Sequence, residues 1–364
     1  MSIQARGVAL AALLLLAPCV RAGVVNPKLS VIGQPQFTIS DEEGPDRGRV
    51  RLDVGETEIV VEDYLNPYAR GSFTFAYAEE GLELEEGYVE VLRGVPLGLA
   101  LKLGKHRLEF GKLNTQHPHS LPFAERFGLL AAFLPGEESL NDTGLQASLR
   151  LPAPGELSVV ATAELLQGDS FRRGLDEVEE ETESRPAVLA RLSAFSLLGE
   201  RSGLELGLSA TEGTNNVAAG TRTRVLGADA KAKLWRGERA YLLLQAEAMA
   251  LHREDASLDP DTGHYAHDTV DPWGWYAFAD YNFALRWNLG ASFERFQQDD
   301  ANKDWNASVG LFGGFAVMEE TTLLRLDWRR VQPATSPGEE SHDAVNTLTL
   351  RIIYSMGPHK AHQF

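Results

Sequence analysis

The 364-residue sequence is almost free of cysteine, since Cys19 is the only one. It lies in an N-terminal segment with the features of a cleaved export signal: Arg6, then a short apolar stretch over 8–17, then the small-residue site Val20-Arg21-Ala22. We therefore predict a signal peptide over 1–22. Cleavage would leave residues 23–364 without cysteine, which excludes disulfides and thiol chemistry from the mature chain.

Long apolar runs and an excess of positive charge are missing too. No later stretch of roughly 18 apolar residues could span a bilayer as a helix. The 34 lysines and arginines are outnumbered by 52 acidic residues, so no basic face is available for nucleic acid. Phosphate-binding glycine loops, zincin helices and nucleophile elbows are missing as well. We expect neither an enzyme nor a nucleic-acid-binding protein, and the composition indicates no cofactor.

Short segments of alternating apolar and polar residues fill the rest of the chain. In 347–354, Leu348, Leu350, Ile352 and Tyr354 share one face and polar residues share the other. This period of two is typical of a strand with one apolar face. The sequence predicts sixteen such strands, near 29–40, 50–63, 68–78, 82–93, 97–111, 143–152, 156–167, 187–197, 203–212, 222–235, 240–252, 274–283, 285–297, 305–317, 321–332 and 346–356. The alternation breaks near Gly104, where we predict a β-bulge.

The connections between these strands alternate in length. Tight turns such as 94–96 and 236–238 alternate with longer polar connections such as 112–142 and 253–273. Short turns at one end and long loops at the other are typical of an outer-membrane barrel. We predict an all-β fold over 23–364: a single transmembrane antiparallel β-barrel of about 16 strands, located in the cell outer membrane, with apolar faces toward lipid.

Charged side chains on the polar faces indicate a hydrated lumen. Burying so many charges in a dry core would be costly unless each were paired, whereas large barrels hold water. The predicted lumen charges are Glu56, Glu58, Glu86, Glu90, Lys231, Lys233, Arg325, Arg329 and Arg351. Whether they select ions or only keep the lumen hydrated stays open.

The third predicted extracellular loop, 112–142, is too apolar to extend into water. The third loop of barrel porins of this size commonly folds inward, so we predict that it narrows the lumen. An external loop closed on its own apolar side chains is the alternative. The predicted constriction residues are Leu121, Phe123, Phe127, Leu130 and Phe133.

The same loop contains the motif His117-Pro118-His119. Two imidazoles flanking a proline can point to one side and bind a divalent transition metal such as zinc. A firm site needs three or four ligands, and His264 and His267 are candidates elsewhere. The simpler interpretation is that these are polar loop residues that hydrogen-bond to the barrel wall.

Several segments together resemble a known family. They are Asn66-Pro67-Tyr68-Ala69-Arg70, Glu85-Glu86-Gly87-Tyr88, Leu103-Gly104-Lys105, Phe110-Gly111-Lys112-Leu113-Asn114, His117-Pro118-His119 and the tail from Gly357 to Phe364. The chain resembles uncharacterised Gram-negative outer-membrane porin-like proteins, which are similar to phosphate-selective porins. Phe364 resembles the terminal aromatic read by the barrel-assembly machinery.

The resemblance implies a porin that passes small hydrophilic solutes or ions, with outer-membrane lipid and the assembly machinery as partners. A homotrimer is left open. Some similar proteins are labelled zinc-regulated TonB-dependent receptors, a likeness carried here by His117 and His119 alone. The chain lacks their large plug domain and falls short of their 22 strands. The alternatives are a metal-related, zinc-binding uptake barrel and a structural or adhesive barrel.

Overall fold

The computed structural model describes residues 27–78, 81–136, 139–173, 183–259, 262–298, 304–318, 321–335 and 343–357. The predicted signal peptide and Phe364 lie outside these residues. No helix in the described ranges is long and apolar enough to cross a membrane.

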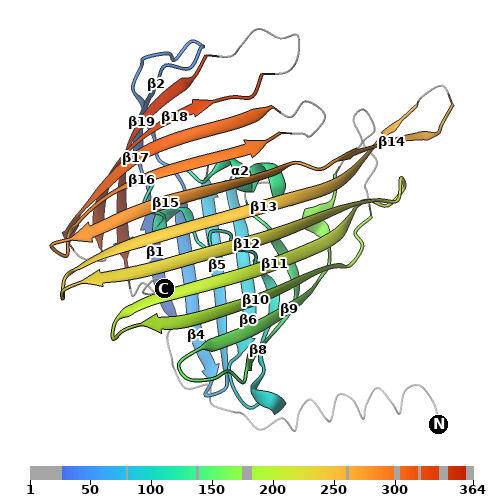
Figure 1. The fold of residues 1–364 in the computed structure, drawn as a ribbon, viewed down its shortest axis with the longest axis horizontal. Helices are drawn as coiled ribbons and strands as arrows, with labels where there is room; N and C mark the ends of the chain where they lie inside the picture. The colour runs from blue at the N-terminus through green and yellow to red at the C-terminus, as the bar shows by residue number, and fades with distance from the viewer. Residues whose placement is uncertain are drawn as a thin grey trace, which may run out of the picture.

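One antiparallel sheet curls into a closed barrel (Figure 1). Its strands are β1 (Lys28–Gly33), β2 (Gln36–Ser40), β3 (Arg51–Asp53), β4 (Thr57–Asn66), β5 (Ala69–Ala78), β6 (Gly81–Val91), β7 (Ala100–Arg107), β8 (Asn141–Leu151), β9 (Ser158–Leu166), β10 (Ala187–Leu198), β11 (Ser202–Asn216), β12 (Thr221–Arg236), β13 (Ala240–Leu258), β14 (Tyr265–Val270), β15 (Trp273–Phe283), β16 (Trp287–Gln297), β17 (Trp305–Met318), β18 (Thr322–Gln332) and β19 (Val345–Met356). The short helices are η1 (Pro96–Gly98), η2 (Pro118–Ser120), α2 (Gly128–Phe133) and η3 (Asp169–Phe171).

Three pairs of these strands are single barrel strands with an interruption. β1 and β2 both pair with β19 across the break at Gln34-Pro35. β3 and β4 pair with β2 and β1 in the same way, and β14 and β15 both pair with β13. Proline cannot donate to a strand ladder, which accounts for the breaks at Pro35 and Pro272. With each pair counted once, the barrel has the sixteen strands that the sequence predicts.

The alternation of side chains matches the barrel geometry. On β18, Leu326 points outward and is half exposed, whereas Arg325 and Asp327 point inward and are buried. Leu348 and Leu350 on β19 are exposed on the outer face in the same way. The apolar faces therefore form the outer surface, and the polar faces enclose the interior.

Two details of the predicted strands are wrong. The connection predicted over 253–273 is largely strand, because β13 and β14 continue as a hairpin beyond the barrel (Figure 1). This hairpin has no apolar face, so it gives no alternating signal. β7 pairs without a register shift on either side, so no bulge lies at Gly104. The alternation ends there because the strand itself ends at Arg107 and the next residues enter the interior.

A bulge does lie one strand away, on β6. Thr74 pairs with Glu86 and Phe75 pairs with Leu84, which leaves Glu85 as an extra residue. A bulge re-aims the side chains next to it. Glu85 and Glu86, which would point to opposite faces of a regular strand, both contact His117 inside the barrel.

The segment between β7 and β8 folds into the barrel and narrows its interior, as predicted. Phe127 stacks on Tyr276 of β15 with ring centroids 4.1 Å apart. Phe123 meets Phe278 and Phe312 edge-on, at 5.3 and 5.6 Å. The buried apolar residues of this in-folded loop (108–136 and 139–140) are Leu108, Phe110, Leu113, Leu121, Phe123, Ala124, Phe127, Leu129, Leu130, Phe133, Leu134 and Leu140. The alternative of an external loop is thereby excluded.

A small residue on the wall makes room for this loop. A Cβ added at Gly227 of β12 would lie 2.8 Å from the ring of Phe110. We expect Gly227→Ala to lower the free energy of unfolding by about 1–3 kcal/mol, because the packed ring has to shift. Gly71→Ala is the matched control, since its new Cβ meets only ordinary contacts with Leu65. Urea unfolding of both variants checks this, and equal stabilities would contradict the packing described.

Candidate functional site: the charged interior and the anchored loop

A cavity of about 770 Å³ lies inside the barrel against the in-folded loop. It reaches Tyr241, Leu285 and Trp287 beside the short-turn end of the barrel, and the first limb of the loop, 107–122, forms one of its sides. Most of its lining is polar or charged. Such an interior suits water and hydrophilic solutes better than an apolar ligand.

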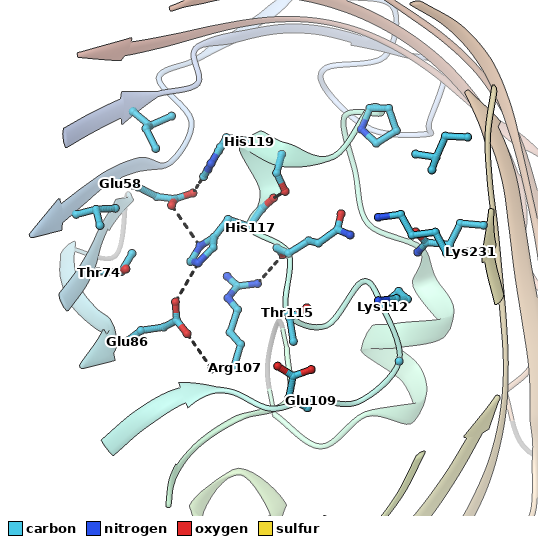
Figure 2. A pocket seen from close by; sticks show the side chains of 18 of the residues that line it. Glu58, Thr74, Glu86, Arg107, Glu109, Lys112, Thr115, His117, His119 and Lys231 are labelled. Atoms are coloured by element: carbon cyan, nitrogen blue, oxygen red, sulfur yellow. Dashed lines mark hydrogen bonds and ion pairs between the residues drawn. The ribbon is translucent and has the colours of Figure 1, made fainter. Parts of the chain in front are cut away.

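Charges of opposite sign face each other across this cavity. Glu58 projects from β4 and Lys231 and Lys233 project from β12. These strands are the second and the tenth of the sixteen in the ring, so they lie on opposite sides of it. Figure 2 shows Lys231 across the space from Glu58 and Glu86. The arrangement places these acidic and basic side chains on opposite sides of the cavity.

Of the other predicted lumen charges, two also line the cavity. Glu90 on β6 forms an ion pair with Arg70, with Oε2 and Nη2 2.6 Å apart. Arg325 lines the cavity and its Nη1 donates to the carbonyl oxygen of His119 at 2.9 Å. Arg325 thereby ties the in-folded loop to β18.

The remaining three predicted charges are not among the described residues that line the cavity. Arg329 donates to the carbonyl oxygen of Arg126 at 3.0 Å, which also holds the loop. Arg351 donates to Gln36 Oε1 at 2.9 Å, beside the break in the first barrel strand. Glu56 is half-buried in the interruption between β3 and β4.

Carboxylates of the wall accept hydrogen bonds from the backbone of the loop. Glu247 Oε1 accepts from the N–H groups of Lys112 at 2.7 Å and Leu113 at 2.9 Å. Glu294 Oε2 accepts from Leu129 N–H at 3.1 Å. These bonds satisfy loop donors that the apolar packing removes from water. Sequence reasoning missed the role of Glu247, for which its inward position on a strand was the only signal.

His117 and His119 lie at the opposite side of the loop, against β4 and β6 (Figure 2). His119 Nδ1 lies 2.7 Å from Glu58 Oε1. His117 Nε2 lies 3.0 Å from Glu86 Oε2. His117 Nδ1 faces two further carboxylate oxygens, Glu58 Oε2 at 3.2 Å and Glu85 Oε2 at 3.3 Å. The stacked imidazoles therefore attach the loop to the wall.

The carboxylates around His117 favour a positive charge on its ring. Burial alone would lower the pKa of His117, but its contacts with Glu58 and Glu86 outweigh burial and raise that pKa above its ordinary value. Arg107 adds one cation, since it forms an ion pair with Glu85.

Glu58, Glu85 and His117 each place one atom that could ligate a metal ion close to the other two. In the described part of the chain, this is the one group of three or more such residues. His119 is not part of it, because its ring contacts the other oxygen of Glu58. His267 lies exposed on β14 and His264 just before it, and neither belongs to the group. The inward position of Glu85 was not predicted, because it depends on the bulge in β6.

Comparison with known proteins supports the fold. No family model matches the chain. An uncharacterized protein of Aquifex aeolicus (strain VF5) is 26% identical over 326 residues, covering 84% of this chain and 67% of that protein. The anion-selective porin from Comamonas acidovorans aligns with a TM-score of 0.62 at 10% identity, over 91% of this chain and 99% of that one. The trimer form of OmpT from Vibrio cholerae aligns with a TM-score of 0.56 at 12% identity, over 91% and 100% of the two chains. At these identities the likeness shows a common barrel fold.

Proposed function

We propose that this protein is an outer-membrane porin that lets small hydrophilic solutes or ions diffuse through its barrel. The observation that carries the proposal is a charge-lined cavity inside a closed barrel whose outer face is apolar. An apolar outer face suits lipid, and a polar interior suits a water-filled path. The similar folds of an anion-selective porin and of other outer-membrane proteins support the same assignment.

The proposal extends to location and partners. Export through the predicted signal peptide over 1–22 and recognition of Phe364 by the assembly machinery would deliver the barrel to outer-membrane lipid. A homotrimer is part of the proposal, because a protein of similar fold has a trimer form. The mass of the detergent-solubilised protein, measured by light scattering, distinguishes a trimer from a monomer.

Solute flux tests the proposal directly. Liposomes containing the refolded protein should swell in isotonic solutions of small sugars, and more slowly as the sugar becomes larger, because the in-folded loop narrows the path. Heat-unfolded protein in the same lipid is the control. Swelling no faster than in empty liposomes would contradict a porin and favour a structural or adhesive barrel.

Charge reversal on β12 should change ion selectivity. We expect the double variant Lys231→Glu, Lys233→Glu to shift the reversal potential, measured in a salt gradient, toward the equilibrium potential of the cation. The basic side of the cavity becomes acidic in this variant, so the interior favours cations. Arg236→Glu is the matched control, because Arg236 is exposed at the end of the same strand. An equal shift in both variants would show that the cavity charges do not lie along the ion path.

A further inference from the structure

Three buried ligand atoms inside the barrel face one another without hydrogen bonds. Within the described part of the chain, Glu58 Oε2, Glu85 Oε2 and His117 Nδ1 have no hydrogen-bond partner of acceptable geometry. One ligand atom from each of the three residues lies within 4.8 Å of the other two. Glu58 is fully buried, so its unmatched oxygen is costly unless a cation compensates it.

The spacing of these atoms fits a metal ion. A tetrahedral zinc site with bonds of about 2.05 Å places its ligand atoms about 3.3 Å apart. His117 Nδ1 lies 3.2 Å from Glu58 Oε2 and 3.3 Å from Glu85 Oε2. The three atoms come from β4, from the bulge of β6 and from the in-folded loop, so the folded barrel assembles the set.

Each ligand is also oriented by a second partner. His117 Nε2 is hydrogen-bonded to Glu86, which leaves the Nδ1 lone pair for a cation. This carboxylate–imidazole pairing is typical of metal-bound histidines. The second oxygen of Glu58 contacts His119, and the second oxygen of Glu85 contacts Arg107.

We propose that His117 Nδ1, Glu58 Oε2 and Glu85 Oε2 bind one divalent transition-metal ion, with the remaining coordination position open toward the cavity. One imidazole and two carboxylates suit zinc-type ions. Calcium takes six to eight oxygen ligands and magnesium prefers an octahedron of oxygen atoms, so neither fits this set.

The ion can reach the site from the interior. His117 lines the cavity and its side chain is 19% exposed. A bound ion would join the loop to β4 and β6 through direct bonds. The site is independent of the porin proposal, because metal binding and ion conductance are measured separately and either can fail alone.

Competition with a chelator for zinc measures how tightly the proposed site binds the ion. Refolded protein, purified with a histidine-free affinity tag, is titrated with Zn²⁺ against a chromophoric chelator. We expect one tightly bound ion per barrel, bound at least about 10-fold more weakly by Glu58→Gln, Glu85→Gln and His117→Ala. His252→Ala is the matched control, because His252 is an exposed residue paired with Asp271, and it should bind like the unmodified protein.

A second readout separates coordination from a merely structural role. X-ray absorption of the zinc-loaded barrel should show nitrogen and oxygen neighbours at about 2.0–2.2 Å. Glu86→Gln, which leaves the three ligands in place, should lower the affinity for zinc about 10-fold. Circular dichroism and heat-modifiable gel migration confirm that each variant is folded. Absence of a tight site in the unmodified protein, or equal affinity in a folded Glu58→Gln or Glu85→Gln variant, would overturn the proposal and leave a proton as the cation between these groups.

Discussion

Removing the in-folded loop is expected to raise the single-channel conductance severalfold. The variant replaces residues 112–136, the middle of the segment that joins β7 to β8, with a short glycine–serine linker. Sixteen strands enclose an aqueous channel when nothing fills it, and here the loop and its packed rings occupy part of the interior. The strands keep their ladders in the variant, so the barrel should still refold.

The matched control shortens a segment of similar kind outside the barrel. The control removes 256–266 from the hairpin formed by the end of β13 and β14, whose described residues lie beyond the barrel (Figure 1). Its conductance should stay near that of the unmodified protein. An unchanged conductance after loss of 112–136 would mean that the ion path does not pass the loop.

The second large effect concerns the contact that seats the loop. Phe127 is 3% exposed, and its ring stacks on that of Tyr276 with the centroids 4.1 Å apart. The ring centroid of Phe123 lies 5.0 Å from that of Phe127. Truncating a buried phenylalanine costs about 3–5 kcal/mol, through lost burial and the cavity left behind. We expect Phe127→Ala to destabilise the loop by this order and to produce larger open-channel noise, since a loosened loop moves within the ion path.

Proteolysis and noise analysis check that expectation. The loop of Phe127→Ala should be cleaved faster than that of the unmodified protein, because local opening exposes it. Phe73→Ala is the matched control, since Phe73 is half exposed on the outer face. Equal cleavage and equal noise in the two variants would show that the ring contact does not hold the loop.

The barrel could be predicted because its apolar outer face imposes a simple pattern. Each strand needs one apolar face, so segments such as 346–356 alternate clearly. The connections give a second signal, because short turns lie at one end of the barrel and longer loops at the other. The outer hairpin of β13 and β14 was missed because both of its faces are exposed. Local patterns therefore reveal strands with one apolar outer face and miss strands that extend beyond the barrel.

The cluster at His117 could be predicted only in part. The histidine motif is visible in the sequence, but Glu58, Glu85 and His117 are far apart along the chain. Their approach depends on the order of strands around the ring, on the bulge that turns Glu85 inward and on the path of the loop. A one-residue change of register reverses which face a side chain joins. Such information is in the paired sheet and not in any one segment.

The loop is held at both ends by different chemistry. Toward β13–β17 it is fixed by ring packing and by wall carboxylates that accept backbone N–H groups. Toward β4 and β6 it is fixed by the imidazole–carboxylate contacts of His117 and His119. Buried hydrogen bonds to charged groups contribute roughly 1.5–3 kcal/mol each. The narrowing of the interior is therefore a fixed property of the fold.

Single-channel recording from the purified protein in a planar bilayer tests the central claim most directly. The account predicts stable conductance steps, with a reversal potential in a salt gradient that depends on Lys231 and Lys233. A bilayer that stays silent, with a barrel shown to be folded by circular dichroism and heat-modifiable migration, would contradict a porin.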